Sequence, residues 1–143
     1  MASVQRSCGL DPGDGLRTGA HMRYHHLGIP THDPREGESF LEEFGVHVTS
    51  HDDNPFGIQW MRYQPDSPLP DLVKTLPHVA FQVDDLDSAL EGRKLLIPPN
   101  SPSEGVTVAF IVHDGAPVEF LEFEPGHPDR LPDEDQKERP RHG

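Results

Sequence analysis

The chain has 143 residues, which is enough for one domain of ordinary size and too few for two independent ones. It carries 25 acidic against 12 basic residues, a formal net charge of -13, so phosphate backbones and anionic lipid surfaces are poor partners for it. The single cysteine, Cys8, excludes an intramolecular disulfide, and no apolar run approaches the ~20 residues that span a bilayer. We therefore expect a cytoplasmic protein that binds neither nucleic acid nor membrane.

Both ends of the chain differ in composition from its centre. Residues 1–21 mix Gly, Asp, Ser and Arg without a period, and residues 125–143 are rich in Pro, Asp, Glu and Arg. Both compositions are typical of segments without a packed core. We interpret the first as a disordered leader or a cloning remnant and the second as a disordered tail, which leaves one domain over residues 22–124.

The first strand is expected over residues 23–29, where polar and apolar side chains alternate. A helix is expected over residues 34–44, because Asp33 suits its N-cap, Pro34 suits its first turn and Gly45 can end it. The apolar stripe of this helix would consist of Phe40, Leu41 and Phe44.

Two further strands, residues 46–49 and 56–63, complete a first module over residues 22–64. A proline-stiffened stretch, residues 65–76, then joins it to a second module. The chain is thus organised as two units of similar length.

The second module, residues 77–124, repeats the order of the first. A strand begins at His78, a short helix is expected over residues 86–91, and another strand over residues 94–97. Residues 98–105 are interpreted as a loop. The module ends in a hairpin with strands at residues 106–112 and 117–123 and a turn around Asp114 and Gly115.

Both modules begin with the same pattern of residues. The segment that starts at His26 (His-Leu-Gly-Ile) aligns without a gap with the segment that starts at His78 (His-Val-Ala-Phe), and an acidic helix-start signal follows in each. Because side chains alternate across a strand, each histidine lies on the face opposite the apolar residue that follows it. A pseudo-twofold axis between the modules would bring the two histidines together.

A carboxylate on the last strand, Glu119, follows the turn at Asp114 and Gly115. Together with the aligned histidines and the two strand-helix-strand units, it resembles the vicinal oxygen chelate superfamily, which includes glyoxalase I, extradiol dioxygenases, methylmalonyl-CoA epimerase and fosfomycin-resistance enzymes. The resemblance covers about residues 22–124. It implies an α+β fold in which two βαβββ modules form a cupped, glyoxalase-like mixed sheet around a divalent metal, and it implies a homodimer.

The same resemblance assigns metal ligands. His26 matches the ligand of the first strand, His78 the ligand that opens the second module, and Glu119 the carboxylate of the final strand. Gln59 falls where some members place a fourth Glu or Gln ligand. Such a set suits Zn, Ni, Mn or Fe and leaves open positions at which two neighbouring oxygens of a small substrate bind.

Several of these assignments have competing interpretations. His25 becomes the inward residue if the first strand slips by one position, and Glu122 competes with Glu119 from the opposite face. Gln59 can instead satisfy the backbone as a half-buried polar residue. Of the other polar residues, Tyr63 either packs or lines the pocket, Arg62 is expected to pair with a surface acid, and His32, His47, His51 and His113 are expected in solvent.

The resemblance implies a metal-dependent isomerase, epimerase or lyase that acts on a small oxygenated metabolite. Glu119 would be a ligand and also the candidate base for proton transfer. One alternative is an extradiol-type Fe(II) dioxygenase, which iron content and oxygen consumption would distinguish. The other is a metal-free ligand-binding protein of the bleomycin-resistance type.

Overall fold

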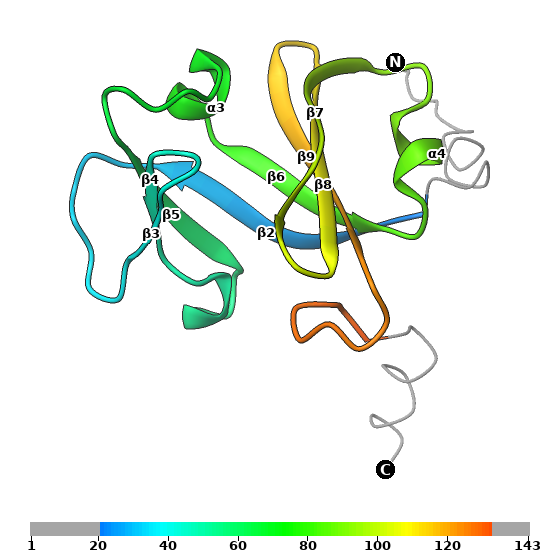
Figure 1. The fold of residues 1–143 in the computed structure, drawn as a ribbon, viewed down its shortest axis with the longest axis horizontal. Coiled ribbons are helices and arrows are strands. Elements are labelled where there is room, and N and C mark those ends of the chain that lie inside the picture. Colours follow the sequence, from blue (N-terminus) through cyan, green and yellow to red (C-terminus); the bar gives the residue numbers. More distant parts are fainter. Residues whose placement is uncertain (1–20, 133–143) are drawn as a thin grey trace, which may run out of the picture.

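The structure, a computed structural model, describes residues 21–132, which form one eight-stranded mixed sheet in the order β3-β4-β5-β2-β6-β9-β8-β7 (Figure 1). The strands are β2 (Met22–Pro30), β3 (Ser39–Leu41), β4 (Val46–Val48), β5 (Ile58–Tyr63), β6 (His78–Val83), β7 (Lys94–Ser103), β8 (Val106–His113) and β9 (Ala116–Phe123). The helical elements are the 3-10 turn η1 (His51–Asp53) and the short helices α3 (Asp71–Thr75) and α4 (Leu86–Leu90).

The two halves of the sheet share one connectivity. Strands β2 and β6 lie antiparallel at the centre, β2 pairs in parallel with β5, and β6 pairs in parallel with β9. Antiparallel pairing then adds β4 and β3 on one side and β8 and β7 on the other. This arrangement confirms the predicted glyoxalase-like sheet built from two repeated units.

Two clusters of buried apolar side chains lie on opposite faces of the second module. Because side chains alternate along a strand, Phe120 of β9 faces one way while its neighbours Glu119 and Leu121 face the other. The cluster beneath α4 consists of Val83, Leu86, Ala89, Ala109, Ile111 and Phe120. The cluster on the opposite face consists of Ala80, Val106, Val108, Leu121 and Phe123.

The β8–β9 hairpin is confirmed, and its turn fixes the register of the last strand. Asp114 and Gly115 both have positive φ, at 50° and 84°, which is the backbone that a tight hairpin turn requires. The resulting register pairs Glu119 with Phe110. A slip of one residue would turn Glu119 to the face covered by α4.

The helix predicted over residues 34–44 is wrong. This segment forms turns and the short edge strand β3. Gly37 adopts the left-handed φ of 81°, which interrupts a right-handed helix, and both carboxylate oxygens of Glu38 accept hydrogen bonds from Arg62 on β5, at 2.7 and 3.0 Å. A tertiary ion pair, of the kind expected for Arg62, therefore outweighs the local helix signals.

Three other expectations also need correction. The join between the modules contains α3, whose Val73 is buried. Strand β7 continues through residues 98–103, which were interpreted as a loop; its prolines are tolerated because β7 is an edge strand, and its register shifts at three places. Phe40 and Leu41, the predicted helical core residues, are 47% and 37% exposed.

Residues 125–132, here called the C-terminal strap, fold back onto the sheet although their composition predicts a disordered tail (Figure 1). The carbonyl oxygen of Pro132 accepts a hydrogen bond from Arg23 at 2.6 Å. The amide of Leu131 donates to Oε1 of Gln82 at 2.7 Å. The strap is therefore part of the folded unit, while the leader up to residue 20 and the tail from residue 133 lie outside the described residues.

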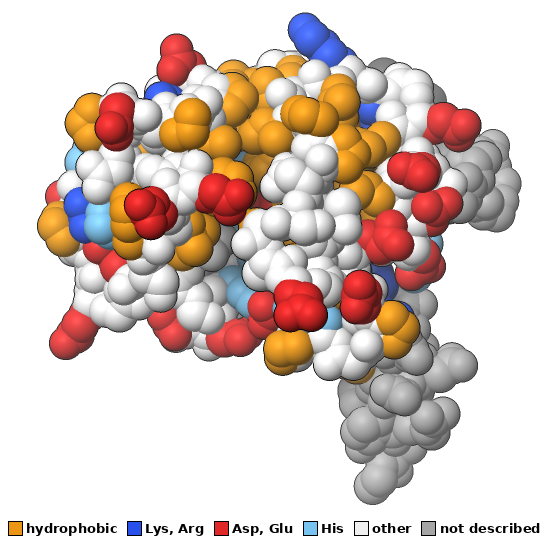
Figure 2. Space-filling view, viewed as in Figure 1, with side chains coloured by type: hydrophobic (Ala, Val, Ile, Leu, Met, Phe, Trp, Pro, Cys, Tyr) orange, Lys and Arg blue, Asp and Glu red, His pale blue; other side chains and the backbone are white. Residues whose placement is uncertain are grey.

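The surface of the described part is acidic, as the composition predicts. Figure 2 shows many Asp and Glu side chains spread over this face and only a few Lys or Arg side chains. Helices α3 and α4 have five residues each, and no helix within residues 21–132 has the length and hydropathy of a membrane span.

The Glu38–Arg62 pair predicts a pH-dependent contribution to stability. Arg62 lowers the pKa of Glu38 from its ordinary 4.5 to about 2. A carboxylate with a depressed folded-state pKa stabilises the fold above its unfolded pKa, and this contribution disappears as pH falls through the folded pKa. In urea unfolding followed by circular dichroism, we expect wild type to exceed Glu38→Gln in stability above about pH 5 and the gap to close toward pH 2.

The matched control is Glu36→Gln, which removes an exposed carboxylate two residues away. Its stability should follow that of wild type at every pH. A Glu38→Gln deficit that stays constant down to pH 2 would contradict the assigned role of the ion pair.

Candidate metal centre

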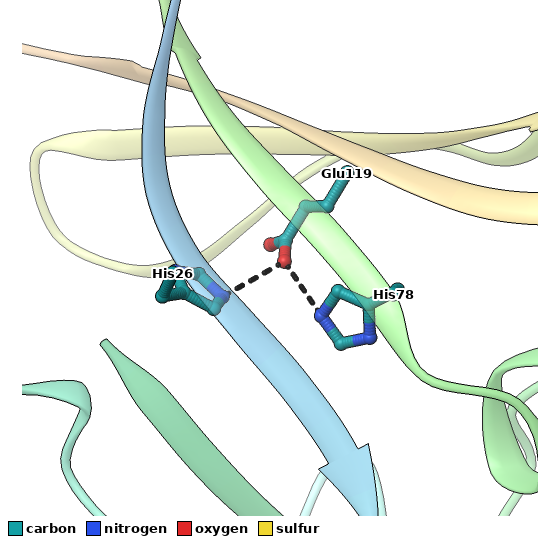
Figure 3. A group of neighbouring side chains, drawn as sticks. All are labelled: His26, His78 and Glu119. Atoms are coloured by element: carbon teal, nitrogen blue, oxygen red, sulfur yellow. Dashed lines mark ion pairs between the residues drawn. The ribbon is translucent and has the colours of Figure 1, made fainter. Parts of the chain in front are cut away.

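His26 of β2, His78 of β6 and Glu119 of β9 meet on one face of the sheet, within a single chain (Figure 3). Oε1 of Glu119 lies 3.3 Å from Nε2 of His26 and 3.1 Å from Nε2 of His78. The side chains are nearly buried: Glu119 is 11% exposed, His26 7% and His78 2%. Two ligands that each lie about 2.1 Å from one ion are themselves about 3.0–3.4 Å apart, so this spacing fits a shared ion.

Two small residues make room for this triad. Ala80 is the pairing partner of both His26 and Glu119, and it is fully buried. Gly28 is the pairing partner of His78, and a Cβ at Gly28 would lie 2.2 Å from Cε1 of that ring. The imidazole of His78 therefore occupies the space that a side chain at position 28 would fill.

The strand register also relates Gln59 to Glu119. Gly28 pairs with Gln59 on β5 in the way that Ala80 pairs with Glu119 on β9. The pseudo-twofold axis that maps the first module's histidine and glycine onto the second module's histidine and alanine thus maps Gln59 onto Glu119. Gln59 also lines the cavity beside the triad.

His25 and His26 are both buried, although a regular strand would send them to opposite faces. The register of β2 shifts between Tyr24 and His26, and such a bulge lets neighbouring residues turn to one side. Nδ1 of His25 lies 2.8 Å from Nδ1 of His26, and Nε2 of His25 lies 2.7 Å from the carbonyl oxygen of Asp129 in the strap. His25 and His26 were weighed above as alternatives for the inward position of the first strand, and the structure directs both rings to the same side.

This hydrogen-bonded chain assigns the protons of both rings. The carbonyl of Asp129 can only accept, so Nε2 of His25 carries a proton. Burial lowers the pKa of His25, which favours the neutral ring, and its Nδ1 then accepts a hydrogen bond from the Nδ1–H group of His26. Nε2 of His26 is left with a lone pair that faces Oε1 of Glu119, and these two atoms repel each other unless a cation or a proton lies between them.

The electrostatics of Glu119 favour a bound cation. Burial by itself raises the pKa of this carboxyl, but the neighbouring imidazoles of His26 and His78 outweigh burial and lower the pKa to about 2. Nδ1 of His78 is buried without a hydrogen-bond partner among the described residues. Two imidazoles and an ionised carboxylate are a donor set that divalent transition metals prefer.

The competing assignments can be decided from the contacts of each residue. Oε1 of Glu122 accepts a hydrogen bond from the amide of Leu86 at 2.8 Å, so this carboxylate caps the start of α4 on the opposite face. His32 and His113 are exposed, as expected. His47 and His51 are partly buried, which corrects the expectation of solvent exposure; the ring of His51 lies 4.7 Å from that of His25. No sequence pattern marks His51, because it lies in the short 3-10 turn η1, outside the repeated strands.

A cavity of about 240 Å³ opens beside the triad. Tyr63 lines it, and among the described residues its hydroxyl has one hydrogen-bond acceptor, the sulfur of Met61 at 3.6 Å, which is weak. Burial and the nearby charge of Glu119 raise the pKa of Tyr63, so the phenol keeps its proton. Most of the wall is apolar and includes Val48, Val106, Val108, Phe110, Leu121 and Phe123.

Comparison with protein-family models and with curated protein sequences finds no match. Solved structures do match. The hypothetical protein BH1468 from Bacillus halodurans C-125 is 18% identical, with a TM-score of 0.59 over 75% of this chain and 98% of that chain. Methylmalonyl-CoA epimerase from Mycobacterium tuberculosis is 20% identical, with a TM-score of 0.53 over 76% of this chain and 91% of that chain. These similarities confirm the glyoxalase-like fold that the sequence resemblance predicted.

The contact between Gly28 and His78 predicts the effect of a single methyl group. In Gly28→Ala the new Cβ must displace the ring of His78, and overpacking of this kind costs about 1–3 kcal/mol. We expect lower stability in urea unfolding together with weaker Zn²⁺ binding. Gly37→Ala, which strains a left-handed residue with open space around it, should lower stability without changing Zn²⁺ affinity. Unchanged Zn²⁺ affinity in Gly28→Ala would contradict this account.

Proposed function

We propose that the chain is a metal-dependent enzyme of the glyoxalase-like kind, an isomerase, epimerase or lyase that acts on a small oxygenated metabolite. The observation that carries the proposal is the buried contact of Oε1 of Glu119 with two imidazole nitrogens, at 3.1 and 3.3 Å, one of which presents a lone pair. His26, His78 and Glu119 would hold the ion, and the register supports Gln59 as a fourth ligand.

A divalent ion in this place, whether Zn, Ni, Mn or Fe, would act as a Lewis acid on an oxygen of the substrate. Both histidines contact Oε1 of Glu119, which leaves Oε2 to take up a proton from a neighbouring carbon of the substrate. Tyr63 would donate a hydrogen bond to a substrate oxygen, because its proton has only a weak acceptor, the sulfur of Met61, among the described residues. The apolar wall would exclude water during the proton transfer.

Two alternatives differ in chemistry. Two histidines and one carboxylate also suit non-haem Fe(II), so an extradiol-type dioxygenase is the second candidate, and it predicts iron in the purified protein and oxygen consumption. A metal-free ligand-binding protein is disfavoured by the lone pair of His26 that faces a buried carboxylate. A homodimer and a cytoplasmic location stay part of the proposal, and light scattering tests the first.

Removal of one histidine should abolish metal retention. We expect wild type, purified without added metal, to hold about one divalent ion per chain, and His78→Ala to hold almost none, because the site loses one of its three donor atoms and its geometry. His113→Ala, which removes an exposed histidine, is the matched control and should retain metal as wild type does. Elemental analysis by mass spectrometry measures all three. Full retention in His78→Ala would refute the assignment.

A further inference from the structure

The cavity beside the triad has no positively charged side chain in its wall. Among the described residues that line it there is no Lys or Arg. Its polar groups outside the triad belong to His25, His51, Gln59, Tyr63, Asn100 and Asp129. An anionic substituent that pointed away from the triad into this cavity would lose its hydration without gaining an opposite charge from the lining side chains, which is costly in an apolar setting.

The acidic surface of the protein also disfavours anionic substrates. The chain has a net charge of -13, and acidic side chains surround the face shown in Figure 2. Two cations of the described part are already engaged, since Arg62 binds Glu38 at 2.7 Å and Lys74 lies 3.7 Å from Asp71. Anionic molecules would therefore be repelled both on approach and after entry.

The size of the cavity limits the substrate further. At about 30 Å³ for each water, 240 Å³ holds about eight waters, or an organic molecule of about ten non-hydrogen atoms. A thioester of CoA would leave most of its atoms outside and bring its phosphates against an acidic surface. The name of the similar epimerase implies a CoA thioester as the substrate of that enzyme, and such a molecule would fit this cavity poorly.

We propose that the substrate is an uncharged molecule of about ten non-hydrogen atoms, with two neighbouring oxygens at one end and an apolar body that fills the cavity. This inference rests on the proposed function for the role of the two oxygens. Tyr63 donates a hydrogen bond to one of those oxygens, and the apolar wall contacts the rest of the molecule.

Two probes that differ in one substituent, uncharged in the first and anionic in the second, test this proposal. Both 4-methylcatechol and 3,4-dihydroxybenzoate carry neighbouring hydroxyl groups, and a methyl group in the first replaces the carboxylate of the second. We expect Zn²⁺-loaded protein to bind 4-methylcatechol at least about tenfold more tightly in calorimetric titration, the factor that corresponds to one modest desolvation penalty. Equal or tighter binding of 3,4-dihydroxybenzoate would overturn the proposal.

A variant that adds a Lys to the cavity wall shows whether the absence of Lys and Arg there causes the preference for the uncharged probe. Asn100 lines the cavity, while the next residue, Ser101, is exposed and does not. Asn100→Lys should narrow or reverse the preference, and Ser101→Lys should leave it unchanged. An unchanged preference in Asn100→Lys counts against the proposal. Metal content is measured before the titration, so that the proposed metal-dependent function and the proposed charge preference are tested separately. Wild type that fails to hold Zn²⁺ contradicts the proposed function and not the charge preference.

A second inference rests on the hydrogen-bonded chain that links the strap to His26. Metal-bound histidines are usually held by a hydrogen bond to the nitrogen that does not bind the ion, and the partner is often a carboxylate or a carbonyl. Here the partner of His26 is the ring of His25, which is itself held by the carbonyl of Asp129, 104 residues later in the chain. The rings of His51 and Phe123 lie 4.7 and 5.2 Å from that of His25 and enclose it.

We infer that His25 is a positioning residue: it fixes His26 as the tautomer protonated at Nδ1 and so keeps Nε2 free for the ion. The strap anchors this arrangement through the carbonyl of Asp129. The inference goes beyond the proposed function, because the tautomer of His26 is a property of the protein without metal.

Two variants of His25 separate hydrogen bonding from packing. His25→Gln retains one acceptor and one donor, whereas His25→Phe retains a ring of similar size and loses both. In competition with a chelator, we expect His25→Phe to bind Zn²⁺ about 10–100-fold more weakly than wild type and His25→Gln to stay near wild type. Wild-type affinity in His25→Phe, or an equal loss in both variants, would overturn the inference.

Nitrogen-15 NMR of the metal-free protein supplies a readout that packing alone does not change. We expect the ring of His26 to be protonated at Nδ1 in wild type and in His25→Gln, and to shift toward protonation at Nε2 in His25→Phe. Protonation at Nε2 in wild type contradicts the positioning role whether or not the protein binds a metal. Nδ1 protonation without Zn²⁺ binding supports it and contradicts only the proposed function.

Discussion

The antiparallel pairing of β2 with β6 is the constraint on which the site depends. This pairing sets His26 opposite Ala80 and Gly28 opposite His78. Each histidine therefore has, on the neighbouring strand, a partner residue that is too small to block its ring. The parallel pairing of β6 with β9 then brings Glu119 beside Ala80. A shift of one residue in either pairing would separate the three side chains, because strand side chains alternate between faces.

The repeat, the central strands and the final hairpin could be predicted from the sequence because each has a local signal. The aligned histidine segments mark the two central strands. Asp114 and Gly115 mark the turn that determines which face of the sheet Glu119 points to. The helix expected over residues 34–44 failed because its cap and stripe signals are weaker than the long-range bond between Glu38 and Arg62, which no local pattern reveals. Local propensity is a weak prior where a tertiary contact competes with it.

The parts of the site that sequence reasoning missed come from irregular backbone. The strap has a composition typical of disorder, yet its backbone groups bind side chains of the two central strands: Asp129 binds His25, and Leu131 binds Gln82. A backbone carbonyl can act in this way whatever side chain it carries, so residue type gives no signal for the contact. The bulge in β2 is equally hidden, although it decides that His25 and His26 turn to the same side.

These irregular segments break the symmetry of the repeat and give the two histidines different supports. His26 is held by hydrogen bonds, through His25, whereas Nδ1 of His78 has no partner among the described residues and its ring is held by packing on Gly28 and against Phe110, with centroids 4.9 Å apart. A hydrogen bond fixes which nitrogen of a ring carries the proton, while packing fixes only where the ring lies. The duplicated strands thus supply equivalent positions for the ligands, and the unrepeated segments determine the protonation of only one of the two histidines.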